Sequence, residues 1–254
     1  MTHIRTSTVD RIARIELDRA DKKNAITADM YQAMADALKA AEADPQVRVV
    51  LIHGRPDCFT AGNDLKDFLD KPPSGPDSPV FQFLHRISTA AKPLVAAVSG
   101  PAVGIGTTLL LHCDFVYASP NARFQMPFVT LGLVPEAASS FLLPMLAGYH
   151  RAAELLLLGK PFTAEKALAA GIVTEIVPEG DLIDHALEVA ARIAALPPSS
   201  VRMTKALMKA RYAATVAEAM GSEGEKFRAQ LGSPEAKEAM QAFFEKRKPD
   251  FSKF

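Results

Sequence analysis

The chain has 254 residues, of which 48% are hydrophobic and 23% are charged. This balance is typical of a globular protein, and the length is enough for one α/β domain with a substantial core or for two small domains. The 29 basic and 29 acidic side chains give a formal net charge of zero. Charge therefore gives no reason to expect nucleic acid or an acidic membrane surface as a partner.

Cysteine and histidine usage bears on compartment and metal chemistry. Cys58 and Cys113 are the only cysteines and lie among apolar residues, so we expect buried free thiols and no disulfide framework. The six histidines show no metal-ligand spacing, and no metal site is expected. No apolar run approaches the roughly 20 residues of a membrane span, and we expect a cytoplasmic protein with no membrane partner. The final Ser252-Lys253-Phe254 differs by one residue from the peroxisomal Ser-Lys-Leu signal, which we interpret as a chance similarity.

Hydrophobic patterns, taken in chain order, predict strands that alternate with helices. Period-two alternation predicts a strand over residues 8–18. Thr27 is a suitable N-cap for a helix that ends at Asp44-Pro45. Apolar runs predict further strands over residues 47–53, 94–98, 114–118 and 173–177. Helical spacing recurs over residues 81–88, 104–112, 154–158, 164–170, 182–196, 201–214 and 235–246.

These patterns indicate an α/β fold that becomes mostly helical toward the C-terminus. We predict a core domain over residues 1–198 and a helical region over residues 199–254 that covers the core, acts as a lid or forms a subunit interface. The Pro- and Ser-rich stretch at residues 71–79 separates two apolar segments. It is predicted to be a surface loop and a possible lid over a site.

A glycine-rich turn, GPAVGIG, lies between an apolar strand and a predicted helix. Gly104 and Gly106 flank Ile105, and such a turn directs the unpaired first N–H groups of the helix outward, where they suit an anion or a developing oxyanion. A dinucleotide fingerprint would need a third glycine at position 109, which is Leu. Tight packing of strand against helix is the alternative explanation for these glycines.

A second turn of small residues, FTAGNDL, follows the strand predicted over residues 47–53. Ala61 and Gly62 would let the backbone approach a ligand closely. Asp64 could equally cap a helix that begins at Leu65. The turn is thus either part of a site or a capped helix start.

Glu136 is a carboxylate set among apolar residues in the segment LGLVPEAASS. Burial without a cation would raise its pKa and make it a better general base near neutral pH. The alternative is an acid in the first turn of a helix after Pro135, where the helix dipole favours it. No Gly-x-Ser-x-Gly nucleophile motif is present.

Together these segments resemble the crotonase (enoyl-CoA hydratase/isomerase) superfamily. The similarity runs from about residue 5 to about residue 215 through the segments RIELDRADKKNAIT, FTAGNDL, KPLVAAVSGPAVGIGTTLLLHCDFVYAS, ARFQMPFVTLGLVPEAASSFLLP and GKPFTAEKALAAGIVTEIVP. The resemblance implies a crotonase-like spiral of ββα units with a helical C-terminal region, an acyl-CoA thioester as substrate, and assembly as a homotrimer or a dimer of trimers.

The resemblance also implies roles for individual residues. In this family two backbone N–H groups bind the thioester oxygen, and by motif position they belong here to Asn63 and Ile105. The coenzyme A part of the substrate would lie along the residues Lys23, Ala25, Ala61, Gly62, Asn63, Asp64 and Leu65.

The departures from the family pattern select among its reactions. Hydratases use two glutamates, and the corresponding positions hold Thr108 and Phe128, neither of which can act as that base. Glu136 stands where peroxisomal-type Δ3,Δ2-enoyl-CoA isomerases have their single catalytic glutamate. The expectation is a 3-enoyl-CoA to 2-trans-enoyl-CoA isomerase of fatty acid β-oxidation that needs no metal or redox cofactor. Hydration with an unusual water arrangement, another crotonase reaction and a non-catalytic acyl-CoA-binding protein remain as alternatives.

Overall fold

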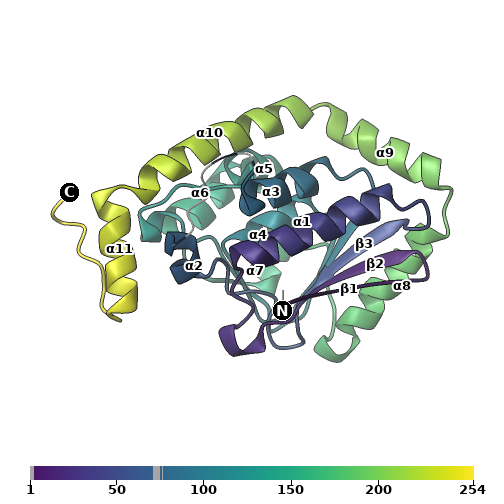
Figure 1. Ribbon diagram of the computed structural model, residues 1–254, viewed down its shortest axis with the longest axis horizontal. Helices are drawn as coiled ribbons and strands as arrows, with labels where there is room; N and C mark the ends of the chain where they lie inside the picture. The colour runs from purple at the N-terminus through teal and green to yellow at the C-terminus, as the bar shows by residue number, and fades with distance from the viewer. Residues whose placement is uncertain (1–2, 71–74, 76) are drawn as a thin grey trace.

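The computed structural model describes residues 3–70, 75 and 77–254, and its largest sheet runs through the centre of the molecule (Figure 1). The strand order is β1-β2-β3-β4-β6-β9, in which β1 and β2 are antiparallel and the later neighbours are parallel. These strands are β1 (Ile4–Val9), β2 (Ile12–Leu17), β3 (Val49–His53), β4 (Leu94–Val98), β6 (Phe115–Ala118) and β9 (Glu175–Ile176). A smaller sheet joins β5 (Pro101–Val103), β7 (Arg123–Gln125) and β8 (Phe162–Thr163).

Helices cover both faces of the large sheet. Along β3, Val50 and Ile52 belong to a core with α1 (Ala28–Ala43) and α3 (Pro79–Thr89). The alternate residues Val49 and Leu51 belong to a second core with α8 (Leu182–Ala194). Side chains of a strand alternate between its two faces, so the continuous apolar run of β3 fits a strand buried on both sides. The α/β fold class is confirmed.

The remaining helices lie around this centre and toward the C-terminus. The α-helices are α2 (Leu65–Asp70), α4 (Ile105–Thr108), α5 (Ser139–Ala147), α6 (Tyr149–Leu158), α7 (Ala164–Ala169), α9 (Pro198–Ala210), α10 (Ala213–Leu231) and α11 (Pro234–Phe244). The 3-10 helices are η1 (Ala20–Lys22), η2 (Leu109–His112), η3 (Val129–Leu131) and η4 (Glu179–Asp181). The predicted cap of α1 is confirmed, because the Thr27 side chain accepts a hydrogen bond from the N–H of Met30. No helix in the described part of the chain is long and apolar enough to cross a membrane.

The prediction of one strand over residues 8–18 was wrong. The chain turns at Asp10 and Arg11, whose φ angles of 50° and 66° lie in the left-handed region, and it forms the hairpin of β1 and β2. Two consecutive positive φ angles are the geometry of a tight two-residue hairpin turn. Because neither residue is Gly or Asn, the sequence carried no strong turn signal.

The single helix predicted over residues 201–214 was also wrong. The chain breaks at Arg211 and Tyr212, so that α9 ends at Ala210 and the long helix α10 begins at Ala213. In Figure 1 α9 and α10 together arch over α3 and α5. The predicted lid at residues 71–79 lies mostly outside the described residues.

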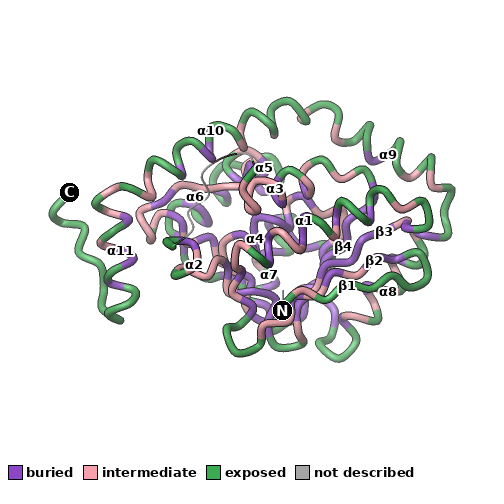
Figure 2. Tube along the Cα trace, in the orientation of Figure 1, coloured by how far each residue is buried: buried purple, intermediate pink, exposed green. Residues whose placement is uncertain are grey.

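The C-terminal region is joined to the core by a buried ion pair. Lys205 of α9 is 5% exposed, and its ammonium group donates to Asp114 at 2.6 Å and to the carbonyl of Lys92 at 2.8 Å. Most of α9 is otherwise exposed (Figure 2). The division into a core domain and a C-terminal region at residue 198 stays a prediction.

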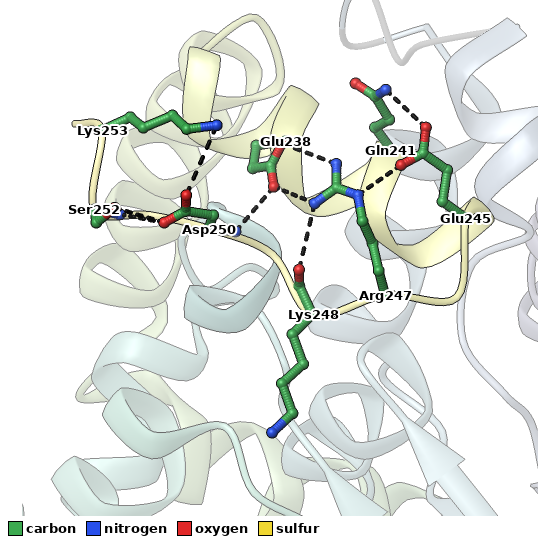
Figure 3. Close-up of polar contacts among 8 residues, drawn as sticks. All are labelled: Glu238, Gln241, Glu245, Arg247, Lys248, Asp250, Ser252 and Lys253. Carbon is green, nitrogen blue, oxygen red and sulfur yellow. Dashed lines mark hydrogen bonds and ion pairs between the residues drawn. The ribbon is translucent and has the colours of Figure 1, made fainter.

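The last residues fold back against α11 (Figure 3). Arg247 donates to Glu238 at 2.5 Å and to Glu245 at 2.6 Å, and the N–H of Asp250 donates to Glu238 at 2.9 Å. Ser252 donates to Asp250 at 2.6 Å. These exposed contacts order the tail without burying it.

Candidate active site

Two tight turns lie against each other at the end of β5. The N–H of Thr60 donates to Pro101 at 2.8 Å, and the N–H of Val103 donates to Thr60 at 3.1 Å. A Cβ atom on Gly62 would come within 2.8 Å of the Val103 carbonyl oxygen, and the φ of Gly62 is +86°. Position 62 therefore requires glycine for both conformation and space. This packing brings the FTAGNDL turn next to the turn that begins α4.

Each turn presents one backbone N–H with no recorded acceptor among the described residues. Ile26 is bonded to the carbonyl of Gly62 and to the N–H of Asp64, at 2.8 and 2.9 Å, so the N–H of Asn63 between them points to the opposite side of the chain. Ile105 is the first residue of α4, and the N–H at this position has no partner within its own helix. Asn63 and Ile105 thus supply two free donors on adjacent turns, as an oxyanion site needs.

Glu136 lies beside the helix whose N–H groups form this site. The hydroxyl of Thr108 donates to the Glu136 carboxylate, and Thr108 lies three residues after Ile105, or about 4.5 Å along the helix axis. The chain has no helix at Glu136, because α5 begins at Ser139. The alternative of an acid in the first helical turn after Pro135 is therefore wrong.

The environment of Glu136 suits a general base. Burial is the main cause that raises the pKa of Glu136, to about 8. The negative charge of Glu223 also raises this pKa, whereas the hydrogen bond from Thr108 lowers it. The residue as a whole is partly exposed. A carboxyl that titrates near neutral pH matches the requirement for a proton-transferring group.

Tyr31 contacts the turn that carries Asn63 and lies within electrostatic range of Glu136. Its hydroxyl donates to the side-chain oxygen of Asn63 at 2.5 Å, and its ring packs against Phe83 with centroids 5.5 Å apart. Burial raises the pKa of Tyr31, and the charge of Glu136 raises it further. The sequence reasoning did not identify Tyr31, whose only signal was its place on the buried face of a helix.

The positions that correspond to the hydratase glutamates are both buried. Thr108 is 0% exposed and Phe128 is 5% exposed. Thr108 acts as a hydrogen-bond donor to Glu136, and Phe128 contributes an apolar side chain to the main core. Neither supplies a second carboxyl to the site.

The residues assigned to coenzyme A lie together in the fold. Lys23 accepts the N–H of Ala61 at 2.9 Å through its carbonyl, and Arg19 bridges the carbonyl of Ala25 and the carboxylate of Asp64 at 2.8 and 2.7 Å. Asp64 also accepts a hydrogen bond from the N–H of Asp67, so it caps the start of α2. A capped helix start was one of the two interpretations of this turn. These hydrogen bonds join the two segments that were assigned to coenzyme A. Their role in binding coenzyme A stays a prediction for Lys23, Ala25, Ala61, Gly62, Asn63, Asp64 and Leu65.

A separate groove lies beneath the arch of α9 and α10. Its volume is about 1200 Å³, and the exposed side chains of Met145, Leu146 and Met208 are part of its lining. Glu136, Asn63 and Ile105 are not among its lining residues. This groove is therefore distinct from the site described above.

Neither cysteine forms a disulfide, and Cys58 is buried while Cys113 is partly buried. Cys58 and Cys113 are free thiols, and burial raises their pKa values to about 11 and about 12. Within residues 3–70, 75 and 77–254, no group of three or more His, Cys, Asp and Glu side chains has a metal-binding arrangement.

Comparison with known proteins places this site in a family. Residues 7–253 match the family described as enoyl-CoA hydratase/isomerase. The chain is 39% identical over 209 residues to enoyl-CoA delta isomerase 2 of Homo sapiens, covering 80% of this chain and 53% of that protein. It therefore spans about half the length of that relative. It is also 32% identical over 243 residues to a probable enoyl-CoA hydratase of Mycobacterium leprae, covering 95% of each.

A solved structure agrees with this assignment. The crystal structure of an enoyl-CoA hydratase/isomerase from Pseudoalteromonas atlantica T6c is 43% identical and superposes with a TM-score of 0.94, covering 98% of this chain and 100% of that one. The resemblance found in the sequence motifs and the crotonase-like fold are both confirmed. From its sequence match and its fold, the chain belongs to the enoyl-CoA hydratase/isomerase family.

Proposed function

We propose that this protein shifts the double bond of a 3-enoyl-CoA to give a 2-trans-enoyl-CoA, as a step of fatty acid β-oxidation. The observation that carries the proposal is the Glu136 carboxyl, which accepts a hydrogen bond from Thr108 at the last residue of α4 and whose pKa burial raises to about 8. Thr108 and Phe128 occupy the positions where the family resemblance places the two hydratase glutamates. One base is enough for isomerisation, whereas the hydratase mechanism uses two.

In the proposed reaction the thioester oxygen lies between the N–H groups of Asn63 and Ile105. The Glu136 carboxylate removes a proton from C2, and the electron pair of the broken C–H bond spreads over a dienolate to the thioester oxygen. The two donors stabilise this charge as it develops, each contributing on the order of 10²–10³ in rate. Glu136 then returns the proton to C4, and the double bond lies between C2 and C3.

The proposed reaction requires no metal or redox cofactor. The proton that leaves C2 returns at C4, so the substrate and the product have the same composition and oxidation state. Coenzyme A enters as part of the substrate, and we propose that it lies along Lys23, Ala25 and residues 61–65. The buried side chain of Phe128 supports the proposal because an apolar surrounding keeps water from the dienolate.

We also propose that the protein works in the cytoplasm as a homotrimer or a dimer of trimers. The support is the exposed apolar surface of α9, where Met203 and Leu207 are 60% and 76% exposed. Apolar side chains that gather on one exposed face more often belong to an interface than to a surface that stays in contact with solvent.

The decisive experiment follows the absorbance of the conjugated product formed from trans-3-hexenoyl-CoA. Wild-type protein should turn over, and Glu136→Gln should lose about 10³-fold in kcat, within the range that a positioned acid–base group contributes. Glu225→Gln changes an exposed glutamate of α10 and should leave the rate unchanged. Wild-type turnover by Glu136→Gln would refute the assignment of the base.

A second assay separates isomerisation from the neighbouring reactions. Hydration of crotonyl-CoA should be slow compared with isomerisation, since Thr108 and Phe128 offer no carboxyl to activate water. Fast hydration with little isomerisation would assign the protein to the hydratases instead. Binding of a CoA ester without exchange of its C2 proton would indicate a non-catalytic binding protein.

A further inference from the structure

The chain directly after Glu136 has a strained conformation. Ala137 and Ala138 have φ angles of 58° and 55°, in the left-handed region that residues with a Cβ atom rarely adopt. Two such residues in succession persist only where surrounding contacts hold them. The contacts around this segment therefore determine where the Glu136 carboxyl lies.

A glutamate from the C-terminal region supplies the most distant of these contacts. One carboxylate oxygen of Glu223, on α10, accepts the N–H of Ala138 at 2.6 Å, and the other accepts the N–H of Ser140 at 2.9 Å. Glu223 is 6% exposed and carries no ion pair among the described residues. Both of its carboxylate oxygens thus bind N–H groups at the strained turn and the start of α5.

Two further contacts complete the support. His112 donates through Nε2 to the carbonyl of Ala137 at 2.7 Å, and the hydroxyl of Ser139 donates to the carbonyl of Glu136 at 2.6 Å. Burial lowers the pKa of His112 to about 4, so this imidazole is neutral at physiological pH. The segment is held from η2, from α5 and from α10, and only α10 contributes a charge.

The ionisable groups around Glu136 are few. α5 contains no titratable residue, η2 contributes the neutral His112, and α1 contributes Tyr31, whose pKa is raised by burial and by Glu136. α10 contributes Glu223, whose own pKa is raised by burial against the hydrogen bonds from Ser140 and Ala138. Glu223 is therefore the nearby carboxyl whose charge opposes the ionisation of Glu136.

We propose that Glu223 is a positioning residue for the reaction: it holds the turn that carries Glu136, so that the C-terminal helix α10 completes the active site. The proposal rests on the proposed function only in naming Glu136 as the base. It assigns Glu223 no contact with substrate. Glu223 acts on the position and on the pKa of the Glu136 carboxyl. A residue that only stabilised the fold would not change that pKa.

The test compares Glu223→Gln and Glu223→Ala with the exposed control Glu225→Gln. Glu223→Gln keeps the shape and one acceptor but loses the charge, so kcat should fall about 10-fold, while Glu223→Ala should lose about 100-fold, the size of effect that a misplaced catalytic group produces. The dissociation constant for a saturated thioester, hexanoyl-CoA, should stay within about threefold. The apparent pKa of kcat/KM should fall in Glu223→Gln because an opposing negative charge has gone.

A direct titration keeps this test independent of the reaction. The side-chain carboxyl of Glu136 can be followed by carbon-13 NMR in protein labelled at glutamate, with Glu136→Gln to assign its signal. A lower pKa in Glu223→Gln than in wild type supports the proposal even if trans-3-hexenoyl-CoA is not isomerised. The proposal is overturned if the folded Gln variant has the wild-type carboxyl titration and kcat, or if kcat and hexanoyl-CoA binding fall together with the melting temperature.

Discussion

Glu136 must lose its proton before it can take one from a substrate. Burial keeps that proton bound up to a pH of about 8, whereas an ordinary glutamate is ionised above pH 5. In the proposed reaction, the apolar surroundings that would exclude water from the dienolate also raise this pKa, so the proposed base is only partly ionised at neutral pH. This compromise gives the reaction a characteristic dependence on pH.

The first prediction is that kcat/KM for trans-3-hexenoyl-CoA rises with pH. The slope should approach tenfold per unit below pH 7, and the rate should level off above about pH 8, because the free enzyme must present ionised Glu136. Initial rates between pH 5.5 and 9.5 measure the profile. A flat profile from pH 6 upward would show that the essential base has an ordinary carboxyl pKa.

Thr108 offers a second test of the same equilibrium. Its hydroxyl stabilises the ionised form of Glu136, so Thr108→Val, which has the same shape, should raise the pKa of Glu136 further. We expect kcat/KM to fall about 10-fold at pH 7 and by much less at pH 9.5, since one pKa unit corresponds to a factor of ten.

The control for this substitution is Thr130→Val on η3. The Thr130 hydroxyl is exposed and donates only to the carbonyl of Pro127, so this variant should behave as wild type at both pH values. An equal loss in Thr108→Val at pH 7 and pH 9.5 would mean that the hydroxyl acts on packing and not on ionisation.

The sequence pointed to Glu136 as the proposed base but not to the residues that contact it and the turn after it. Glu136 was recognisable from its apolar neighbours and from its place in a family motif. Glu223 lies on a helix 83 residues beyond Ser140, and no local pattern relates the two. The sequence analysis noted Thr108 only because hydratases have a glutamate at that position. Its hydrogen bond to Glu136 depends on how α4 packs against the turn after Pro135, which no local pattern shows.

Whole elements were predictable in proportion to their length. The strand β4 and the helix α1 carry several apolar residues at the right spacing, and both were predicted almost to their ends. β8 and β9 have two residues each; β9 lies within the apolar run predicted as a strand over residues 173–177, whereas β8 was not predicted. α10 contains Gly221 and Gly224, and Phe81 packs closely on the second, since a Cβ there would lie 3.0 Å from its ring.

The junction of the two turns is an element whose spacing sets the oxyanion site. Gly62→Ala should displace the FTAGNDL turn, because the new Cβ would lie 2.8 Å from the Val103 carbonyl oxygen at a φ of +86°. We expect kcat to fall about 100-fold, comparable to the loss of one oxyanion donor, and unfolding in urea to show a loss of about 1–3 kcal/mol from the strained backbone.

Gly180→Ala provides the matched control. A Cβ at Gly180 would meet no atom within 4 Å, so its activity and its free energy of unfolding should stay close to wild type. If Gly62→Ala keeps full activity despite lower stability, the position of Asn63 does not control the reaction.

At the scale of the whole molecule, the C-terminal arch carries exposed apolar side chains. Leu207 and Met208 of α9 are 76% and 61% exposed, and Met208 lines the groove of about 1200 Å³ beneath the arch together with Met145 of α5. Lys205 fixes α9 to the core through Asp114, so this apolar face is held in place and cannot turn inward. A rigid apolar face of this kind fits an interface with further copies of the chain.

The last prediction concerns that assembly. Light scattering after size exclusion should give a mass of three or six times 27.3 kDa for the wild type. Leu207→Asp places a charge in the centre of the proposed interface and should shift the mass toward a single chain, because an unpaired buried charge opposes association strongly. Ala40→Asp adds the same charge to an exposed position of α1 and should leave the assembly intact. Wild-type protein that elutes as a monomer, or an unchanged oligomer of Leu207→Asp, would mean that α9 is not the contact surface.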